Sequence, residues 1–179
     1  SVCVLFGDGA GAVVLKAVDN NTEDVTGALV GHERGIIDSN IYNDGTGASV
    51  LTGGRRFSDS CSTDIFIHMD GQEVFKFAVK SVPTAIETLL HNNNMDINDV
   101  DKFILHQANV RIIESVAKRL KADKDKFPVN LNEYGNTSSA SIPILLDELN
   151  RNGSLKQGEK LVLAGFGAGL SWGSILLVW

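Results

Sequence analysis

Three apolar residues, Phe103-Ile-Leu105, are followed by His106, three polar or small residues and then a helical pattern, and this feature constrains the fold more than any other. A strand without polar positions is buried on both faces, because a strand with one solvated face alternates between apolar and polar residues. Residues 160–164 and 174–178 have the same apolar character. The helix after Leu105 has apolar residues at helical spacing: Val110, Ile113, Val116, Ala117 and Leu120. This alternation predicts a layered α/β domain with a mixed sheet covered by helices.

A second helix is predicted over residues 74–90, where apolar residues again recur every three or four positions. We expect Asp70 to cap this helix and Glu73 to complete a capping box. Pro83 lies inside the pattern and is expected to kink or divide the helix, because proline lacks a backbone donor.

A third helix is predicted to end at Asn150, with Ser139 or Ser141 as its cap, Pro143 in its first turn and Gly153 just past its end. The polar, glycine-rich residues 40–63 are predicted to form a long loop, and loops of that length are usually functional or mobile. Further strands or extended segments are predicted over residues 2–6, 10–18, 26–33, 64–68 and 127–131.

Composition excludes several classes of function. The chain has 179 residues, of which 43% are hydrophobic, and a net charge of −6, which argues against a nucleic-acid partner. No apolar run approaches the roughly 20 residues that span a bilayer. Two cysteines, Cys3 and Cys61, are too few and too far apart for a zinc site or a disulfide framework, so we expect a reducing, cytoplasmic compartment. The chain opens with Ser1 rather than Met, and we expect that an upstream part precedes it.

Two motif matches are better explained as turns. Gly169-Leu-Ser-Trp-Gly173 fits the G-x-S-x-G pattern of hydrolases, but an apolar strand follows it where that elbow needs a helix. Gly7-Asp-Gly-Ala-Gly11 lacks the full spacing of a dinucleotide loop and leads into an apolar segment. The histidines at positions 32, 68 and 91 have no metal-ligand spacing, and no metal site is predicted.

Three clusters meet the requirements of a site. His106 follows a buried strand and precedes a helix, the sheet edge at which open α/β folds bind ligands. Tyr134-Gly-Asn-Thr-Ser-Ser-Ala-Ser141 places a carboxamide and several hydroxyls at another helix entrance. The glycine-rich segment 165–169 lets backbone N–H groups approach a substrate oxygen. None of these groups is a strong nucleophile. An imidazole and an amide together suit the stabilisation of an enolate, as in decarboxylation or Claisen condensation.

Five segments of the chain resemble β-ketoacyl-acyl-carrier-protein synthase III, the condensing enzyme that initiates bacterial type II fatty acid synthesis. They are Phe6-Gly-Asp-Gly-Ala-Gly-Ala12, Met69-Asp-Gly-Gln-Glu-Val-Phe-Lys76, His106-Gln-Ala-Asn109, Gly135-Asn-Thr-Ser-Ser-Ala-Ser-Ile-Pro143 and Gly165-Phe-Gly-Ala-Gly-Leu-Ser-Trp-Gly-Ser174. The resemblance runs nearly the whole length. It implies that residues 1–179 are the C-terminal half of a thiolase-like fold, with the N-terminal half and its catalytic cysteine absent. Neither Cys3 nor Cys61 lies in an Ala-Cys-Ser/Ala-Gly motif, so we expect the chain alone to be inactive.

The resemblance also implies roles for individual residues. His106 and Asn136 would complete a Cys-His-Asn triad that holds the malonyl thioester oxygen while carbon dioxide leaves. Phe166 would sit beside the cysteine, and the backbone N–H of Ala168 would help to form an oxyanion hole. Gly71, Phe75 and Asn109 match positions that line the pantetheine channel, and residues 40–63 would be a mobile lid over it.

The implied partners are acyl-CoA, the chain's own N-terminal half, a second copy in a homodimer and acyl carrier protein, with no cofactor beyond the CoA thioester as substrate. Acyl carrier protein is acidic, and four basic residues are expected to bind it: Lys76, Arg111, Lys118 and Arg119. Arg111 and Lys118 share a helical face, which on a generic helix is simply solvated. Two alternatives remain: a non-catalytic thiolase-like scaffold or partner-binding domain, and a related polyketide-type synthase with another starter.

Overall fold

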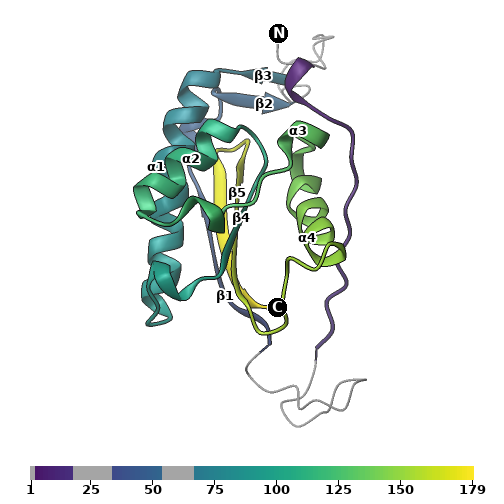
Figure 1. Ribbon diagram of the computed structural model, residues 1–179. Coiled ribbons are helices and arrows are strands. Elements are labelled where there is room, and N and C mark those ends of the chain that lie inside the picture. Colours follow the sequence, from purple (N-terminus) through teal and green to yellow (C-terminus); the bar gives the residue numbers. More distant parts are fainter. Residues whose placement is uncertain (1–2, 18–33, 54–66) are drawn as a thin grey trace.

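A computed structural model describes residues 3–17, 34–53 and 67–179. Its centre is a mixed four-stranded sheet in the order β1-β6-β5-β4, in which β4 and β5 are parallel and the other pairs antiparallel. Helices α1 and α2 cover one face and α4 covers the other (Figure 1). The strands are β1 (Gly35–Asn43), β2 (Leu51–Gly53), β3 (Ile67–Met69), β4 (Lys102–Leu105), β5 (Lys160–Gly167) and β6 (Ser171–Val178). The helices are α1 (Gly71–Asn92), α2 (Val110–Leu120), α3 (Leu131–Tyr134) and α4 (Ser141–Arg151). The predicted layered α/β fold is confirmed.

The apolar character of β4 follows from burial on both faces. Phe103 and Leu105 pack into the core cluster formed with α1 and α2, whereas Ile104 packs with α4. All three side chains are at most 3% exposed. The strand therefore fixes the relative positions of both helical layers, and its carboxyl end carries His106 out of the sheet.

Helix α1 begins as predicted. The Asp70 carboxylate accepts hydrogen bonds from the backbone N–H groups of Gln72 and Glu73 at 3.0 and 3.1 Å. The prediction that Glu73 completes a capping box finds no support, because its carboxylate pairs with Lys76 at 2.7 Å. Pro83 does not divide α1, which is continuous from Gly71 to Asn92, and burial of Pro83 offsets the hydrogen bond that it removes.

Helix α4 has Pro143 in its first turn and Gly153, with φ of +73°, just past its end, as predicted. The predicted serine cap is wrong. The N-cap is Ala140, which makes no side-chain capping bond, and the Ser141 hydroxyl contacts His106 instead. On α2, Val110 was expected to be buried, but it is 42% exposed, and Ile112 is buried instead.

Several segment predictions are also wrong. Residues 3–5 form a 3-10 helix rather than a strand, and residues 10–17 have no regular secondary structure. A strand needs a neighbour with which to exchange hydrogen bonds, and the described residues place none beside residues 10–17. Within the expected loop 40–63, residues 40–43 belong to β1 and 51–53 to β2. Residues 127–131 are not all extended, because α3 begins at Leu131. The strand predicted over 26–33 and loop residues 54–63 lie outside the described part of the chain.

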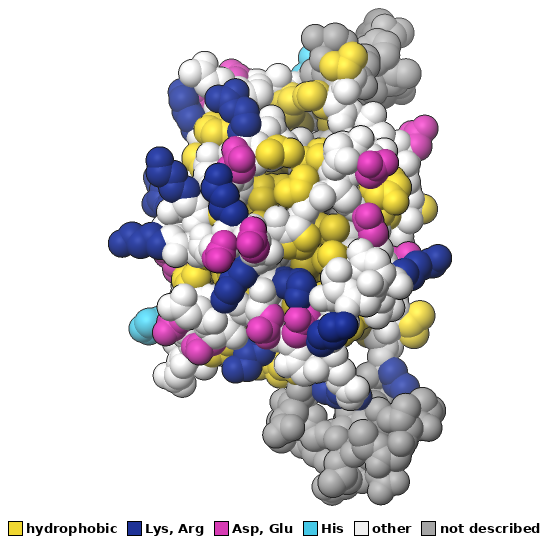
Figure 2. Space-filling model, viewed as in Figure 1, with side chains coloured by type: hydrophobic (Ala, Val, Ile, Leu, Met, Phe, Trp, Pro, Cys, Tyr) yellow, Lys and Arg dark blue, Asp and Glu magenta, His cyan; other side chains and the backbone are white. Residues whose placement is uncertain are grey.

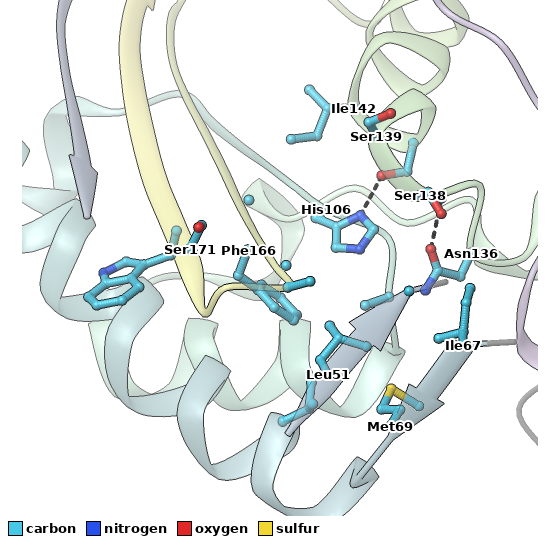
Figure 3. A pocket seen from close by; sticks show the side chains of 18 of the residues that line it. Leu51, Ile67, Met69, His106, Asn136, Ser138, Ser139, Ile142, Phe166 and Ser171 are labelled. Atoms are coloured by element: carbon cyan, nitrogen blue, oxygen red, sulfur yellow. Dashed lines mark hydrogen bonds between the residues drawn. The ribbon is translucent and has the colours of Figure 1, made fainter. Parts of the chain in front are cut away.

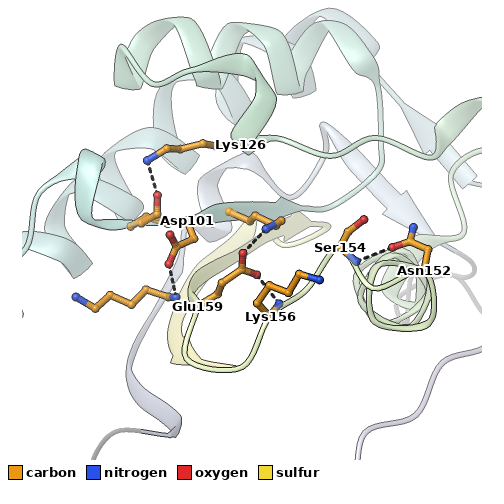
Figure 4. A network of polar contacts seen from close by, with 9 residues as sticks. Asp101, Lys126, Asn152, Ser154, Lys156 and Glu159 are labelled. Carbon is orange, nitrogen blue, oxygen red and sulfur yellow. Dashed lines mark hydrogen bonds and ion pairs between the residues drawn. The ribbon is translucent and has the colours of Figure 1, made fainter.

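The end of the sheet opposite His106 is closed by a polar network (Figure 4). Lys102 and Glu159 form a partly buried ion pair at 2.7 Å, which links the starts of β4 and β5. The Asp101 carboxylate accepts a bond from the backbone N–H of Lys160 at 2.8 Å, and Lys126 donates to the carbonyl of Val100 at 2.6 Å. These polar contacts cover the end of the sheet at which β4 and β5 begin. The opposite end, at which both strands terminate at their carboxyl ends, is the one that carries His106.

Asn40 ties β1, β6 and α1 together. Its side-chain amide donates to the carbonyl of Ala85 in α1 at 2.8 Å. Its side-chain oxygen accepts from both the backbone N–H and the hydroxyl of Ser174, at 3.0 and 2.7 Å. Ser174 is 2% exposed, so its buried polar groups depend on these bonds. In the described part of the chain, no helix is long and apolar enough to cross a membrane.

Asn40→Ala should lower the free energy of unfolding by about 2 kcal/mol, because it leaves buried groups of Ser174 without a partner. Urea-induced unfolding measures this directly. The matched control is Asn132→Ala, which removes an exposed amide bonded to Glu133 and should leave the midpoint nearly unchanged. Equal midpoints for the two variants would contradict the structural role of Asn40.

Candidate active site

A pocket of about 630 Å³ opens at the carboxyl ends of β4 and β5 (Figure 3). Its lining is largely apolar, with side chains from β2, β3 and the β5–β6 hairpin. The polar groups converge on one side, where His106 and Asn136 both line the cavity. A mostly apolar cavity with a few converging polar groups is the usual form of a small-molecule site.

His106 is the first residue past β4, and three contacts position it. Its backbone N–H donates to the carbonyl of Ala164 at 2.9 Å, which continues the β4–β5 pairing by one residue. The ring nitrogen Nδ1 lies 2.7 Å from the hydroxyl oxygen of Ser141. The ring also meets Phe166 edge-on, with centroids 5.4 Å apart. Nε2 is therefore the ring nitrogen left for a bound molecule.

Burial keeps the His106 ring neutral. Desolvation lowers the pKa of this imidazole from 6.5 to about 4, because removal from water disfavours the charged form. At neutral pH the ring therefore carries one proton and can donate one hydrogen bond through it.

Asn136 is held by a segment more than a hundred residues away in the sequence. Its backbone N–H donates to the carbonyl of Leu5, and its own carbonyl accepts from the N–H of Gly7, both at 2.9 Å. A side chain at Gly7 would overlap the carbonyl of Tyr134, so this close approach requires glycine. The Asn136 side-chain oxygen accepts from the backbone N–H of Ser138 at 2.9 Å, which leaves the NH₂ group as the free end of the carboxamide.

The glycine-rich segment is a hairpin rather than the predicted loop. Residues 165–167 belong to β5 and residues 171–173 to β6, so only the tip, residues 168–170, is a turn. Reciprocal backbone bonds of 2.8 Å between Leu170 and Asp44 hold this tip to the end of β1. Both Phe166 and Ala168 line the pocket. The G-x-S-x-G match is confirmed as a connection between two strands.

Gly71, Phe75 and Asn109 do not line the pocket itself, although the adjacent Val74 and Ala108 do. Asn109 caps α2 by accepting from the backbone N–H of Arg111 at 2.9 Å. The Arg111 guanidinium lies over the Phe75 ring, with its central carbon 5.8 Å from the centre of that ring. These residues surround the first turns of α1 and α2, both of which adjoin the cavity.

The four predicted basic residues are all exposed on α1 and α2. Figure 2 shows Lys and Arg side chains gathered over the flank that these helices form. The Glu73 carboxylate, through its hydrogen bond and charge, raises the pKa of Lys76. Lys76 is therefore already paired, whereas Lys118 and Arg119 extend from the last turn of α2.

Sequence reasoning missed the apolar walls of the pocket. Ile41, Leu51, Ile67 and Trp172 line it, although they come from segments predicted to be a loop, a short strand or a connection between strands. Only contacts between segments distant in sequence bring them together, and no local pattern signals that. Among the residues that the structure describes, no cluster of three or more His, Cys, Asp or Glu side chains has the arrangement of a metal site.

Comparisons with known proteins agree with this fold. Residues 90–179 match the family model described as 3-oxoacyl-[acyl-carrier-protein (ACP)] synthase III C terminal. The β-ketoacyl-[acyl-carrier-protein] synthase III of Clostridium acetobutylicum is 44% identical over 99% of this chain and 52% of its own length. That of Acaryochloris marina is 45% identical, with the same coverage. The crystal structure of 3-oxoacyl-(acyl carrier protein) synthase III from Pseudomonas aeruginosa PAO1 superposes with a TM-score of 0.84 and 36% identity, over 99% of this chain and 51% of that chain.

The layered fold and its histidine–carboxamide pocket define a thiolase-like α/β domain. The chain belongs to the family of 3-oxoacyl-acyl-carrier-protein synthase III C-terminal domains, because that family model matches half of it. The resemblance seen in the sequence is thus confirmed. The chain spans about half the length of the curated relatives that it matches.

The buried, neutral His106 should make stability depend on pH. Between pH 6.5 and about 4 the unfolded chain binds a proton that the folded one does not, so the free energy of unfolding falls as pH drops through this window. The total loss should be about 3 kcal/mol. His106→Gln, which has no ionisable group there, should lack this component. Denaturant unfolding of both proteins from pH 7 to pH 4 tests it, and a wild-type minus variant difference that stays constant with pH would contradict it.

Proposed function

We propose that this chain is the C-terminal half of a β-ketoacyl-acyl-carrier-protein synthase III. The complete protein condenses an acyl-CoA, acetyl-CoA in our proposal, with malonyl-acyl carrier protein and so starts fatty acid synthesis. The names of the relatives support the reaction, and the coverage of half their length supports the division into two halves. The proposed setting is the cytoplasm, with no cofactor beyond the CoA thioester that is consumed.

One observation carries the proposal: His106 and Asn136 line the same pocket, each with its other polar atoms already engaged. The Asn136 side-chain oxygen is bound by Ser138, so that its NH₂ group remains available. The neutral His106 ring retains one nitrogen away from Ser141. Two N–H donors on one oxygen stabilise the negative charge that develops on a thioester carbonyl.

In the proposed step, the bond between the malonyl α-carbon and its carboxylate breaks and carbon dioxide leaves. The electron pair forms an enolate, whose oxygen is held by His106 and Asn136. The enolate carbon then attacks the acyl thioester and expels a cysteine thiolate. Phe166 borders that reaction centre, and the backbone N–H of Ala168 contributes to the oxyanion hole for the acyl thioester.

The nucleophile must come from another part of the protein, since neither Cys3 nor Cys61 lies in the family's cysteine motif. We assign it to an N-terminal half packed against this domain, in a protein that forms a homodimer. The exposed run Val13, Val14 and Leu15, which is 71%, 93% and 75% exposed, supports such a covering partner.

Replacing either donor should separate the two half-reactions of the complete enzyme. His106→Ala or Asn136→Ala should slow malonyl decarboxylation on the order of 100-fold or more, because each removes one donor to the enolate oxygen. Transfer of the acyl group to the cysteine should change far less. Radiolabelled acetyl-CoA reports transfer, and release of carbon dioxide from malonyl-acyl carrier protein reports decarboxylation.

His91→Ala is the matched control for these variants, because it removes an exposed histidine at the end of α1. It should leave both half-reactions at the wild-type rate. Equal losses in transfer and decarboxylation for His106→Ala would sink the assignment of His106 to the enolate oxygen.

The basic flank predicts a salt-dependent use of carrier protein. Lys118→Glu should lower kcat/KM for malonyl-acyl carrier protein while sparing acyl transfer from CoA, because charges at a rim act mainly on encounter rate. Raising ionic strength from about 0.01 to 0.1 M shortens the Debye length from roughly 30 to 10 Å, so the deficit should shrink. Lys156→Glu makes the same charge change at the closed end of the sheet and is the control. Equal effects of the two variants at low salt would show that the α2 flank has no special part in docking.

A further inference from the structure

Ser141 occupies an unusual position for a serine at the start of a helix. It is the first residue of α4 and is 2% exposed, yet its hydroxyl caps no backbone group of that helix. The hydroxyl oxygen lies 2.7 Å from Nδ1 of His106 and 3.2 Å from the backbone nitrogen of Gln107. Figure 3 shows the first of these contacts as the dashed line that reaches the His106 ring.

The backbone N–H of Gln107 can only donate, so the Ser141 oxygen accepts from it. The hydroxyl proton of Ser141 must then find an acceptor of its own, because the side chain is buried. The acceptor in contact with it is Nδ1 of His106. Nδ1 therefore carries no proton, and the single proton of the neutral ring lies on Nε2.

Gln107 makes this arrangement rigid. It is 1% exposed, and its side-chain amide donates to the carbonyl of Leu105 at 2.8 Å. Its side-chain oxygen accepts from the backbone N–H of Asn130 at 3.2 Å. With both ends of this side chain bound, the backbone N–H of Gln107 stays aimed at Ser141, and the serine hydroxyl has one orientation available.

We propose that Ser141 is a positioning residue that sets the tautomer of His106. By donating to Nδ1 it holds the proton on Nε2, the nitrogen that faces the pocket. This inference rests on the proposed function for its purpose, because a donor at Nε2 is what an enolate oxygen needs. The tautomer itself follows from contacts within this chain.

The tautomer can be read without any substrate. The complete protein is labelled with ¹⁵N-histidine, and the ring nitrogens of His106 are assigned by their loss in His106→Gln. At pH 7 the wild type should show a protonated Nε2 and an unprotonated, hydrogen-bonded Nδ1. In Ser141→Ala the Nδ1 resonance should move toward that of a free, unprotonated nitrogen, with a second tautomer appearing. Ser141→Thr, which keeps the hydroxyl, should restore the wild-type spectrum.

A protonated Nδ1 in the wild type would overturn the inference, and so would an unchanged His106 spectrum in Ser141→Ala. Thr84→Ala removes a hydroxyl from α1 that donates to Lys80, and it should leave the His106 resonances where they are. Should Ser141→Ala fail to fold, the wild-type spectrum still decides the tautomer.

Activity then separates this inference from the proposed function. Ser141→Ala should slow decarboxylation on the order of 10-fold or more, because a ring in the other tautomer presents no N–H from Nε2 to the enolate oxygen. Ser141→Thr should recover most of the rate. A confirmed Nε2 proton together with unimpaired decarboxylation in His106→Ala would refute the proposed function and leave the tautomer assignment standing.

Discussion

The parallel pairing of β4 with β5 is the interaction on which the site depends. Leu105 pairs with Ala164, and the backbone N–H of His106 donates to the Ala164 carbonyl at 2.9 Å. The histidine therefore leaves the sheet beside Gly165. A Cβ added at Gly165 would lie 4.0 Å from the Cβ of His106. Helices cover both faces of β4. If the pairing register of β4 shifted by one residue, Ile104 would point toward α1 and α2, and its neighbours would point toward α4. Packing in the core thus fixes the position of the imidazole.

The two donors are prepared in different ways. His106 is kept neutral by burial and is oriented through its ring nitrogen by Ser141. Asn136 is oriented through its backbone, by bonds to Leu5 and Gly7, and its side-chain oxygen is bound by Ser138. Donors that are already fixed need no reorganisation when negative charge develops, which is what makes such a site effective. The pocket therefore relies on geometry rather than on a charged residue.

Much of this could be predicted from the sequence, because strand ends and helix starts are marked locally. The apolar run before His106 and the helical pattern after it placed that residue at the sheet edge. Residues 10–17 show the limit, since an apolar pattern indicates the capacity to pair and says nothing about whether a partner strand is present. Asn40 was read as loop because its structural role depends on hydrogen bonds with Ser174, far along the chain. Ser141 was read as a cap, and a contact with a residue 35 positions away took its hydroxyl instead.

The central claim is that His106 and Asn136 hold one thioester oxygen between them. A crystal structure of the complete protein with a stable malonyl-thioester analogue tests this most directly. The account predicts that the analogue's carbonyl oxygen lies about 2.7–3.1 Å from both Nε2 of His106 and the side-chain nitrogen of Asn136. A carbonyl oxygen bound at the Ala168 backbone, with both side chains left without a contact to it, would contradict the account.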